Sequence, residues 1–221
     1  ASDVYKRQDF NRAIMSKPFY AEAYSNRGST WVKKGEYDKA IEDFGRAAEL
    51  FEKRGDTEGA AVAYNNRGVA SRSKGEFDRA IEDYNRAMQL KKDYAVACYN
   101  RGVAWADKGE YDRAIEDYNR AIELFEKRGD TQGAASAYLK RGLAWAARGD
   151  NDSSVADYTK VIELVPDYAE AYDLRGRAWA AKGKNDRAAE DFLNACAMWM
   201  AGGDYDRAIE DCDRAIELKP D

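Results

Sequence analysis

The sequence predicts an all-α fold, a solenoid of antiparallel helix pairs. Three observations support this prediction: a motif that recurs along the chain, apolar residues with helical spacing in each repeat, and a scarcity of proline. Only 3 prolines occur in 221 residues, while 35% of the residues are charged and 44% are hydrophobic. This composition is typical of solvated helices around a modest core.

The recurring motif is Arg-Gly, preceded by Asn in three copies. The distance between its glycines alternates between 40 and 34 residues along Gly28, Gly68, Gly102, Gly142 and Gly176. The longer units carry an extra Lys-Arg-Gly-Asp-Thr segment, which begins at Lys53 and again at Lys127. A fixed period of this size predicts stacked units. We place full units at residues 21–60, 61–94, 95–134, 135–168 and 169–201, with partial units at 9–20 and 202–221.

Each unit contains two segments with helical periodicity. In the second full unit, the apolar or small residues of the first segment are Ala61, Tyr64, Gly68 and Ser71. Those of the second segment are Phe77, Ala80, Tyr84, Ala87 and Leu90. Gly75 separates the two segments, and Glu76 and Asp78 place acidic side chains near the start of the second helix, where the helix dipole favours them. One such pair cannot bury its apolar face alone, so neighbouring pairs must stack.

These residues resemble the tetratricopeptide repeat, whose pattern places an aromatic residue, Gly, an aromatic residue, Ala, an aromatic residue and Ala at fixed offsets. The first full unit matches it with Tyr24, Gly28, Trp31, Ala40, Phe44 and Ala47, and the third has Cys98 in place of the first aromatic residue. The resemblance covers nearly the whole chain. It implies a right-handed superhelical solenoid, here of about twelve helices.

One systematic departure from the family pattern is an arginine where the family usually has leucine, namely Arg27, Arg67, Arg101, Arg141 and Arg175. Each unit also carries an aspartate at a fixed later offset, namely Asp43, Asp83, Asp117, Asp157 and Asp191. We expect these residues to pair between the two helices of a unit. The alternative is independent placement on the surface, where an ion pair contributes about 0–1 kcal/mol.

The resemblance implies that first-helix side chains on the inside of the superhelix bind an extended peptide. The candidate groove residues are Asn26, Asn66, Val69, Tyr99, Asn100, Val103, Leu139, Lys140 and Leu143. The asparagines would hydrogen-bond the peptide backbone, and the apolar side chains would receive one or two hydrophobic anchors. The alternative is that asparagine belongs to the repeat consensus whatever the array binds. The chain would then be a structural segment of a larger protein whose effector or enzymatic domain lies elsewhere.

Composition excludes several other functions. The absence of histidine removes histidine-based catalysis and histidine-containing metal sites. Acidic pairs such as Glu116-Asp117 recur once per unit, which is typical of a solvated helix face rather than of a catalytic site. The net charge of −5 without a basic block argues against nucleic-acid binding, and no apolar run is long enough to span a membrane. We therefore predict a non-catalytic scaffold that binds a protein or peptide, with no cofactor and no metal.

The three cysteines, Cys98, Cys196 and Cys212, are odd in number and widely spaced. This arrangement is neither a disulfide framework nor a paired metal motif, so we expect plain buried thiols. Plain thiols favour a reducing compartment, and we accordingly expect a cytoplasmic protein.

Two segments break the periodicity. Residues 1–8 match the translation of a common transposase sequencing adapter, so we expect them to be foreign and the chain to be a fragment from environmental DNA. Near the other end, only 20 residues separate Gly183 from Gly203. Residues 185–201 begin like a second helix and end like a first helix, which predicts that one helix is missing from the alternation.

Overall fold

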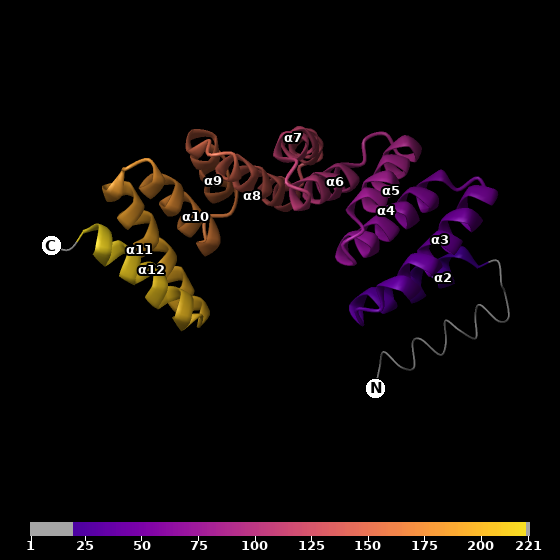
Figure 1. The fold of residues 1–221 in the computed structure, drawn as a ribbon, viewed down its shortest axis with the longest axis horizontal. Helices are drawn as coiled ribbons and strands as arrows, with labels where there is room; N and C mark the ends of the chain where they lie inside the picture. The colour runs from indigo at the N-terminus through magenta and orange to yellow at the C-terminus, as the bar shows by residue number, and fades with distance from the viewer. Residues whose placement is uncertain (1–19, 220–221) are drawn as a thin grey trace. The chain divides into compact units, whose positions relative to one another are not determined.

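The computed structural model describes residues 20–219, which form eleven α-helices and no strand. The foreign segment predicted at residues 1–8, and nearly all of the partial unit predicted at 9–20, lie outside this range. The chain divides into two larger units, Ala1–Glu110 and Tyr111–Asp221, each of which contains several repeats. From here on, "unit" means one of these two parts and "repeat" means one helix pair. The first unit contains α2 (Ala21–Lys33), α3 (Tyr37–Lys53), α4 (Thr57–Ser73), α5 (Phe77–Leu90) and α6 (Ala95–Asp107) (Figure 1). The second contains α7 (Tyr111–Lys127), α8 (Thr131–Ala147), α9 (Asn151–Leu164), α10 (Ala169–Ala181), α11 (Asn185–Gly202) and α12 (Tyr205–Leu218).

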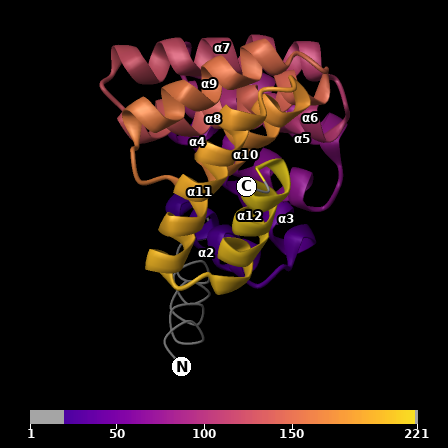
Figure 2. The same ribbon diagram turned by 90° about the vertical axis from the view of Figure 1, so that its left-hand side faces the viewer.

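Within each unit, every helix packs against the next along the chain, so the predicted all-α fold of antiparallel helix pairs is confirmed. Helices α11 and α12, for example, lie side by side in both views (Figure 1, Figure 2). The connections are tight turns. Gly75 ends the turn after α4 with a φ of 87°, a left-handed conformation that favours glycine.

The two helices of a repeat approach closely because a first-helix glycine lies under an aromatic ring of the second helix. A Cβ atom on Gly68 would lie 2.7 Å from Cε1 of Tyr84, and one on Gly142 would lie 2.6 Å from Cε1 of Tyr158. Gly28 with Phe44 and Gly176 with Phe192 repeat this contact. Any larger residue in place of the glycine would push the helices apart.

The predicted Arg–Asp pairs form beside each of these contacts. In four of the five repeats the pair lies within one unit of the chain, and Nη2 of the arginine is 2.5–2.8 Å from Oδ1 of the aspartate in Arg27–Asp43, Arg67–Asp83, Arg141–Asp157 and Arg175–Asp191. Nε of each arginine donates a second hydrogen bond to the same carboxylate. The aspartates are buried, so the alternative of independent surface placement is wrong for these four pairs.

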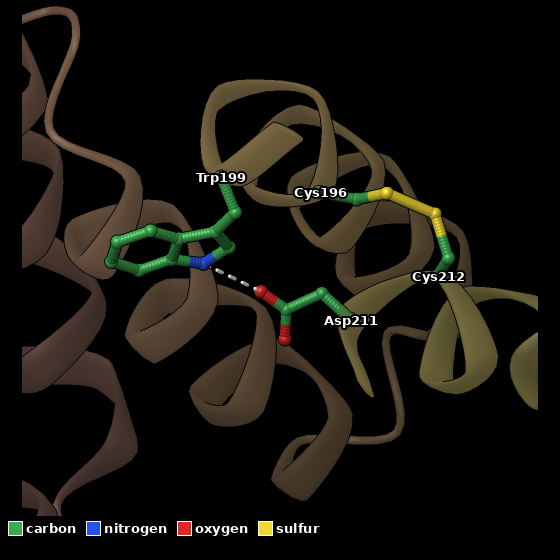
Figure 3. Close-up of a disulfide and its surroundings, with 4 residues drawn as sticks. All are labelled: Cys196, Trp199, Asp211 and Cys212. Carbon is green, nitrogen blue, oxygen red and sulfur yellow. Dashed lines mark hydrogen bonds between the residues drawn. A yellow bond between two sulfur atoms is a disulfide. The ribbon is translucent and has the colours of Figure 1, made fainter. Parts of the chain in front are cut away.

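At the end of the second unit, α11 packs against two neighbours, α10 with its first half and α12 with its second half. The first half of α11 packs against α10 through Phe192, which covers Gly176. Its second half packs against α12, where Cys196 and Cys212 form a disulfide with their Cα atoms 5.7 Å apart (Figure 3). The two cysteines are 16 residues apart, the same separation as in the glycine–aromatic contacts, so a covalent bond replaces that contact here.

This disulfide corrects the expectation of three plain thiols, which holds only for the buried Cys98. Sequence spacing hid the pair because the two cysteines belong to different helices and meet only through the repeat geometry. Disulfides persist in oxidising surroundings, so the argument for a cytoplasmic location loses its support.

Beside the disulfide, Asp211 occupies the aspartate position of the repeat, but Ala195 stands where the arginine would be. The carboxylate instead accepts hydrogen bonds from Nε1 of Trp199 at 3.0 Å (Figure 3) and from Nη1 of Arg214 at 3.0 Å. Arg214 also bridges to Asp173 on α10 at 2.9 Å. Burial, together with the nearby Asp173 carboxylate, raises the pKa of Asp211 to about 6.

We predict that Asp83→Ala lowers the free energy of unfolding by about 3 kcal/mol, because it leaves the Arg67 guanidinium without its buried partner. Urea unfolding of the full chain measures this loss. The control is Asp38→Ala, which removes an exposed 2.7 Å pair with Lys74 and should cost at most about 1 kcal/mol. Equal losses for the two variants would contradict the structural role of the buried pair.

We also predict that reducing the disulfide destabilises the α11–α12 pair by about 3 kcal/mol, the amount expected when a bond that closes a loop of about 15 residues is removed. Hydrogen exchange of α12 amides, with and without dithiothreitol, measures the effect. The double variant Cys196→Ala/Cys212→Ala should show no response to the reductant, whereas Cys98→Ala should respond fully. Unchanged α12 protection after reduction of the unsubstituted chain would refute this prediction.

Candidate peptide-binding surface

The predicted groove residues lie on first helices of the repeats, in two sets. Six are in the first unit: Asn26 on α2, Asn66 and Val69 on α4, and Tyr99, Asn100 and Val103 on α6. Three are on α8 of the second unit: Leu139, Lys140 and Leu143. The two sets thus lie in different units of the chain.

The first unit has a pocket of about 190 Å³ between α2 and α4. Its apolar part consists of Val32, Val69 and Phe44, and its polar part consists of Ser29, Lys33 and Asn66. Two of the predicted residues, Asn66 and Val69, therefore line this pocket. A small apolar pocket with a few polar groups at its edge is suited to one hydrophobic side chain of a ligand.

Two of the predicted asparagines are joined through a third one. Nδ2 of Asn65 donates to Oδ1 of Asn66 at 3.3 Å, and Nδ2 of Asn100 donates to Oδ1 of Asn65 at 3.0 Å. Asn65 is buried, whereas Asn66 and Asn100 are half-exposed. Within the described residues, Nδ2 of Asn66 and Oδ1 of Asn100 have no hydrogen-bond partner. The NH₂ group of Asn66 and the amide oxygen of Asn100 therefore remain for a ligand.

Asn65 is not among the residues that the sequence predicts for the groove. Its signal is the doublet Asn65-Asn66, since an asparagine precedes the Asn-Arg-Gly motif only in this repeat. The repeat pattern also predicts the same role for Asn26 as for Asn66 and Asn100. Asn26 is exposed, and its backbone carbonyl accepts from Oγ1 of Thr30 at 3.0 Å, but no hydrogen bond within the described range joins its side chain to Asn66.

On α6, Tyr99 and Val103 are half-buried beside Asn100. Burial raises the pKa of the Tyr99 hydroxyl, and the guanidinium of Arg72 on α4 opposes this shift. Arg72 also binds Asp107 at the end of α6 at 3.0 Å, which ties α4 to α6. These contacts fix the spacing of the two helices that carry the asparagines.

In the second unit, Leu139 does not belong to a binding surface, which corrects the sequence prediction. Only 5% of it is exposed, and it packs in a core cluster with Val155, Tyr158 and Val161 of α9 and with residues of α10. Leu139 precedes Lys-Arg-Gly as Asn65 precedes Asn-Arg-Gly, and both side chains are buried. Lys140 and Leu143 remain half-exposed.

We predict that Leu139→Ala destabilises the second unit by about 2–5 kcal/mol, because it leaves a cavity in the α8–α9–α10 core. Leu143→Ala, at a half-exposed position of the same helix, should cost about 1 kcal/mol. Thermal unfolding followed by circular dichroism compares the two. A loss for Leu139→Ala no larger than that for Leu143→Ala would place Leu139 on the surface after all.

Neither a metal-binding cluster nor a membrane-spanning helix emerges from the part of the chain that the structure describes. No group of three or more acidic or cysteine side chains in that part could hold a metal ion. None of its helices combines the length and the apolar character that crossing a bilayer requires.

Comparison with solved structures finds similar folds. MamA is 27% identical, with a TM-score of 0.68 over 80% of this chain and 97% of that one. YrrB, described as a TPR protein with an unusual peptide-binding site, is 23% identical, with a TM-score of 0.62 over 96% and 93% of the two chains. A chain of the APC/C hetero-tetramer Cut9–Hcn1 is 18% identical, with a TM-score of 0.74 over 95% of this chain and 39% of that one.

Comparison with curated protein sequences finds no match. Four family models match the chain, each described as tetratricopeptide repeat, over residues 19–93, 95–128, 139–201 and 200–221. Together they span most of the sequence. The chain therefore belongs to the tetratricopeptide repeat family.

Proposed function

We propose that the chain is a non-catalytic interaction module and that its first unit binds an extended peptide across α2, α4 and α6. The observation that carries this proposal is the pocket of about 190 Å³ with half-exposed Asn66 on its wall. The descriptions of two similar structures support it: YrrB has a peptide-binding site, and Cut9–Hcn1 is an assembly of different chains.

The residues around the pocket define the peptide chemistry. One aliphatic side chain of the peptide fills the space between Val32 and Val69, and burying it contributes about 1.5–3 kcal/mol. Asn66 and Asn100 bond the peptide backbone, each bond adding about 0.5–1.5 kcal/mol. Lys33 at the pocket edge is exposed and favours an acidic residue next to the aliphatic one.

The remaining half-exposed residues extend this chemistry. Tyr99 and Val103 on α6 offer further apolar contact in the first unit. In the second unit, Lys140 and Leu143 on α8 place a cation and an apolar side chain on one helix face, the same combination as at the pocket.

A second candidate function is that of a structural segment in a larger protein. The hydrogen bond from Asn100 to Asn65 favours it, because it holds α6 against α4, and Asn65 in turn donates to Asn66. In that case, substituting them would lower stability without changing any binding.

Peptide display against the immobilised full chain tests the proposal. Ser29→Trp fills the pocket from an exposed position, and Ser73→Trp is the matched control because it makes the same change at an exposed position outside the pocket. We expect selected peptides to share an aliphatic residue beside an acidic one. They should bind Ser29→Trp at least tenfold more weakly, a loss of about 1.4 kcal/mol, and Ser73→Trp unchanged.

The double variant Asn66→Ala/Asn100→Ala should also bind these peptides more weakly, with circular dichroism confirming that it folds. If selected peptides bind all the variants equally, the groove proposal is wrong. A loss of stability with no loss of binding would favour the structural role.

A further inference from the structure

In three repeats Nη1 of the arginine makes a further contact, which for Arg141 and Arg175 is the third besides the two hydrogen bonds to their aspartate. Nη1 of Arg101 donates to Oδ1 of Asn85 at 2.5 Å, and Nη1 of Arg141 donates to Oδ1 of Asn119 at 2.5 Å. Nη1 of Arg175 donates to Oγ1 of Thr159 at 3.1 Å. In all three repeats the acceptor is a neutral oxygen on the second helix of the preceding repeat, at the position after the buried aromatic residue.

Arg67 lacks this third contact because the corresponding residue is Gly45. A Cβ atom on Gly45 would lie 3.2 Å from Nη1 of Arg67, so the guanidinium points at the space where a side chain would be. All hydrogen bonds of Arg67 among the described residues go to Asp83. Gly45 lies inside α3 without a positive φ, where glycine costs about 1 kcal/mol relative to alanine.

Gly45 lies in the wall of an open surface cavity of about 640 Å³ over α3. The cavity is lined by Tyr24, Ile41, Glu42, Gly45, Arg46 and Arg67, among others, and shares no residue with the pocket between α2 and α4. This volume exceeds what one water molecule occupies. The cavity can therefore hold a whole side chain from another molecule.

Apart from the exposed Glu42, the charged side chains that line the cavity are paired. Arg27 binds Asp43, Arg46 binds Glu49 at 2.9 Å, Arg79 binds Glu76 at 3.2 Å and Asp38 binds Lys74. Arg67 itself is neutralised by Asp83. What the site lacks is a hydrogen-bond acceptor for Nη1, not a negative charge, and the other repeats supply a neutral acceptor at this place.

Glu42 adds the complementary group. It lines the same cavity, and its carboxylate has no hydrogen-bond donor among the residues that the structure describes. A ligand that accepts from Arg67 and donates to Glu42 would satisfy both. A primary carboxamide has one carbonyl oxygen and one NH₂ group and meets both requirements, whereas a carboxylate has no donor to offer Glu42.

We propose that this cavity binds the side-chain carboxamide of an asparagine or glutamine presented by a partner protein. The carbonyl oxygen accepts from Nη1 of Arg67, as Asn85 and Asn119 do for their arginines, and the NH₂ group donates to Glu42. The site lies wholly in the first unit and is independent of the proposed peptide groove.

Nuclear magnetic resonance titration of the isotope-labelled full chain tests this proposal. The probes are N-acetyl-glutamine-N-methylamide and the matched capped derivatives of glutamate and norvaline, which replace the amide by an anion and by an apolar group. We expect the glutamine probe alone to shift the Gly45 amide and the Arg67 Nε–H signals with saturation, with a dissociation constant in the millimolar range because the probe is small.

Two variants test the position of the site, one by filling it and one by creating a second site. Gly45→Asn supplies the acceptor from within the chain and should weaken binding of the glutamine probe at least tenfold. Asn119→Gly removes the acceptor of Arg141 and should create a second responsive site beside that arginine. Circular dichroism confirms that both variants are folded.

Three results would overturn the proposal. The glutamine probe could cause no saturable shift, or the glutamate probe could bind as tightly as the glutamine probe, which would make the cavity an anion site. Unchanged binding to folded Gly45→Asn would place the probe elsewhere. None of these results bears on the peptide groove, since the two sites have no residue in common.

Discussion

The contact between a first-helix glycine and an aromatic ring 16 residues later sets the geometry on which the other features depend. The ring can approach only because the glycine has no side chain, so each contact fixes both the distance and the register of a helix pair. The arginine directly before the glycine and the aspartate directly before the ring then face each other. The ion pair is therefore a consequence of the steric contact. Because the aspartate is buried, a shift of one helix along the other would leave its charge unpaired, so the pair also holds the two helices in register.

The same register explains how one helix shapes two surfaces. Phe44 of α3 covers Gly28 and contributes to the pocket between α2 and α4, while the next residue, Gly45, lies in the wall of the cavity beside Arg67. Adjacent residues of a helix point in different directions, so a change at one position leaves the other surface intact. A substitution at Gly45 can thus change the cavity while Phe44 keeps its contact with Gly28 and its place in the pocket.

The sequence alone was sufficient for the fold and for the Arg–Asp pairs, because both follow from one repeated spacing. It was insufficient where a residue departs from the repeat. Leu139 was placed in the groove although its position is buried, and the Cys196–Cys212 bond depends on α11 pairing with two neighbours. The roles of Asn65 and Gly45 depend on their contacts with Asn100 and Arg67, and the repeat spacing does not show these contacts. The predicted groove residues do lie on first helices, but the pocket lined by Asn66 and Val69 depends on three-dimensional packing.

The alternation between long and short repeats has a consequence for folding cooperativity. Helices α3 and α4 have 17 residues each, and the extra turn places Phe51 over Gly59, whereas α5 and α6 have only 14 and 13 residues. In repeat proteins, the free energy of unfolding is roughly the sum of the stabilities of the single repeats and of the interfaces between neighbouring repeats. Where some interfaces are weaker than others, the array divides into segments that unfold separately. The α3–α4 junction should thus behave as the interior of one folding segment, and the short α5–α6 junction as a boundary where local unfolding begins.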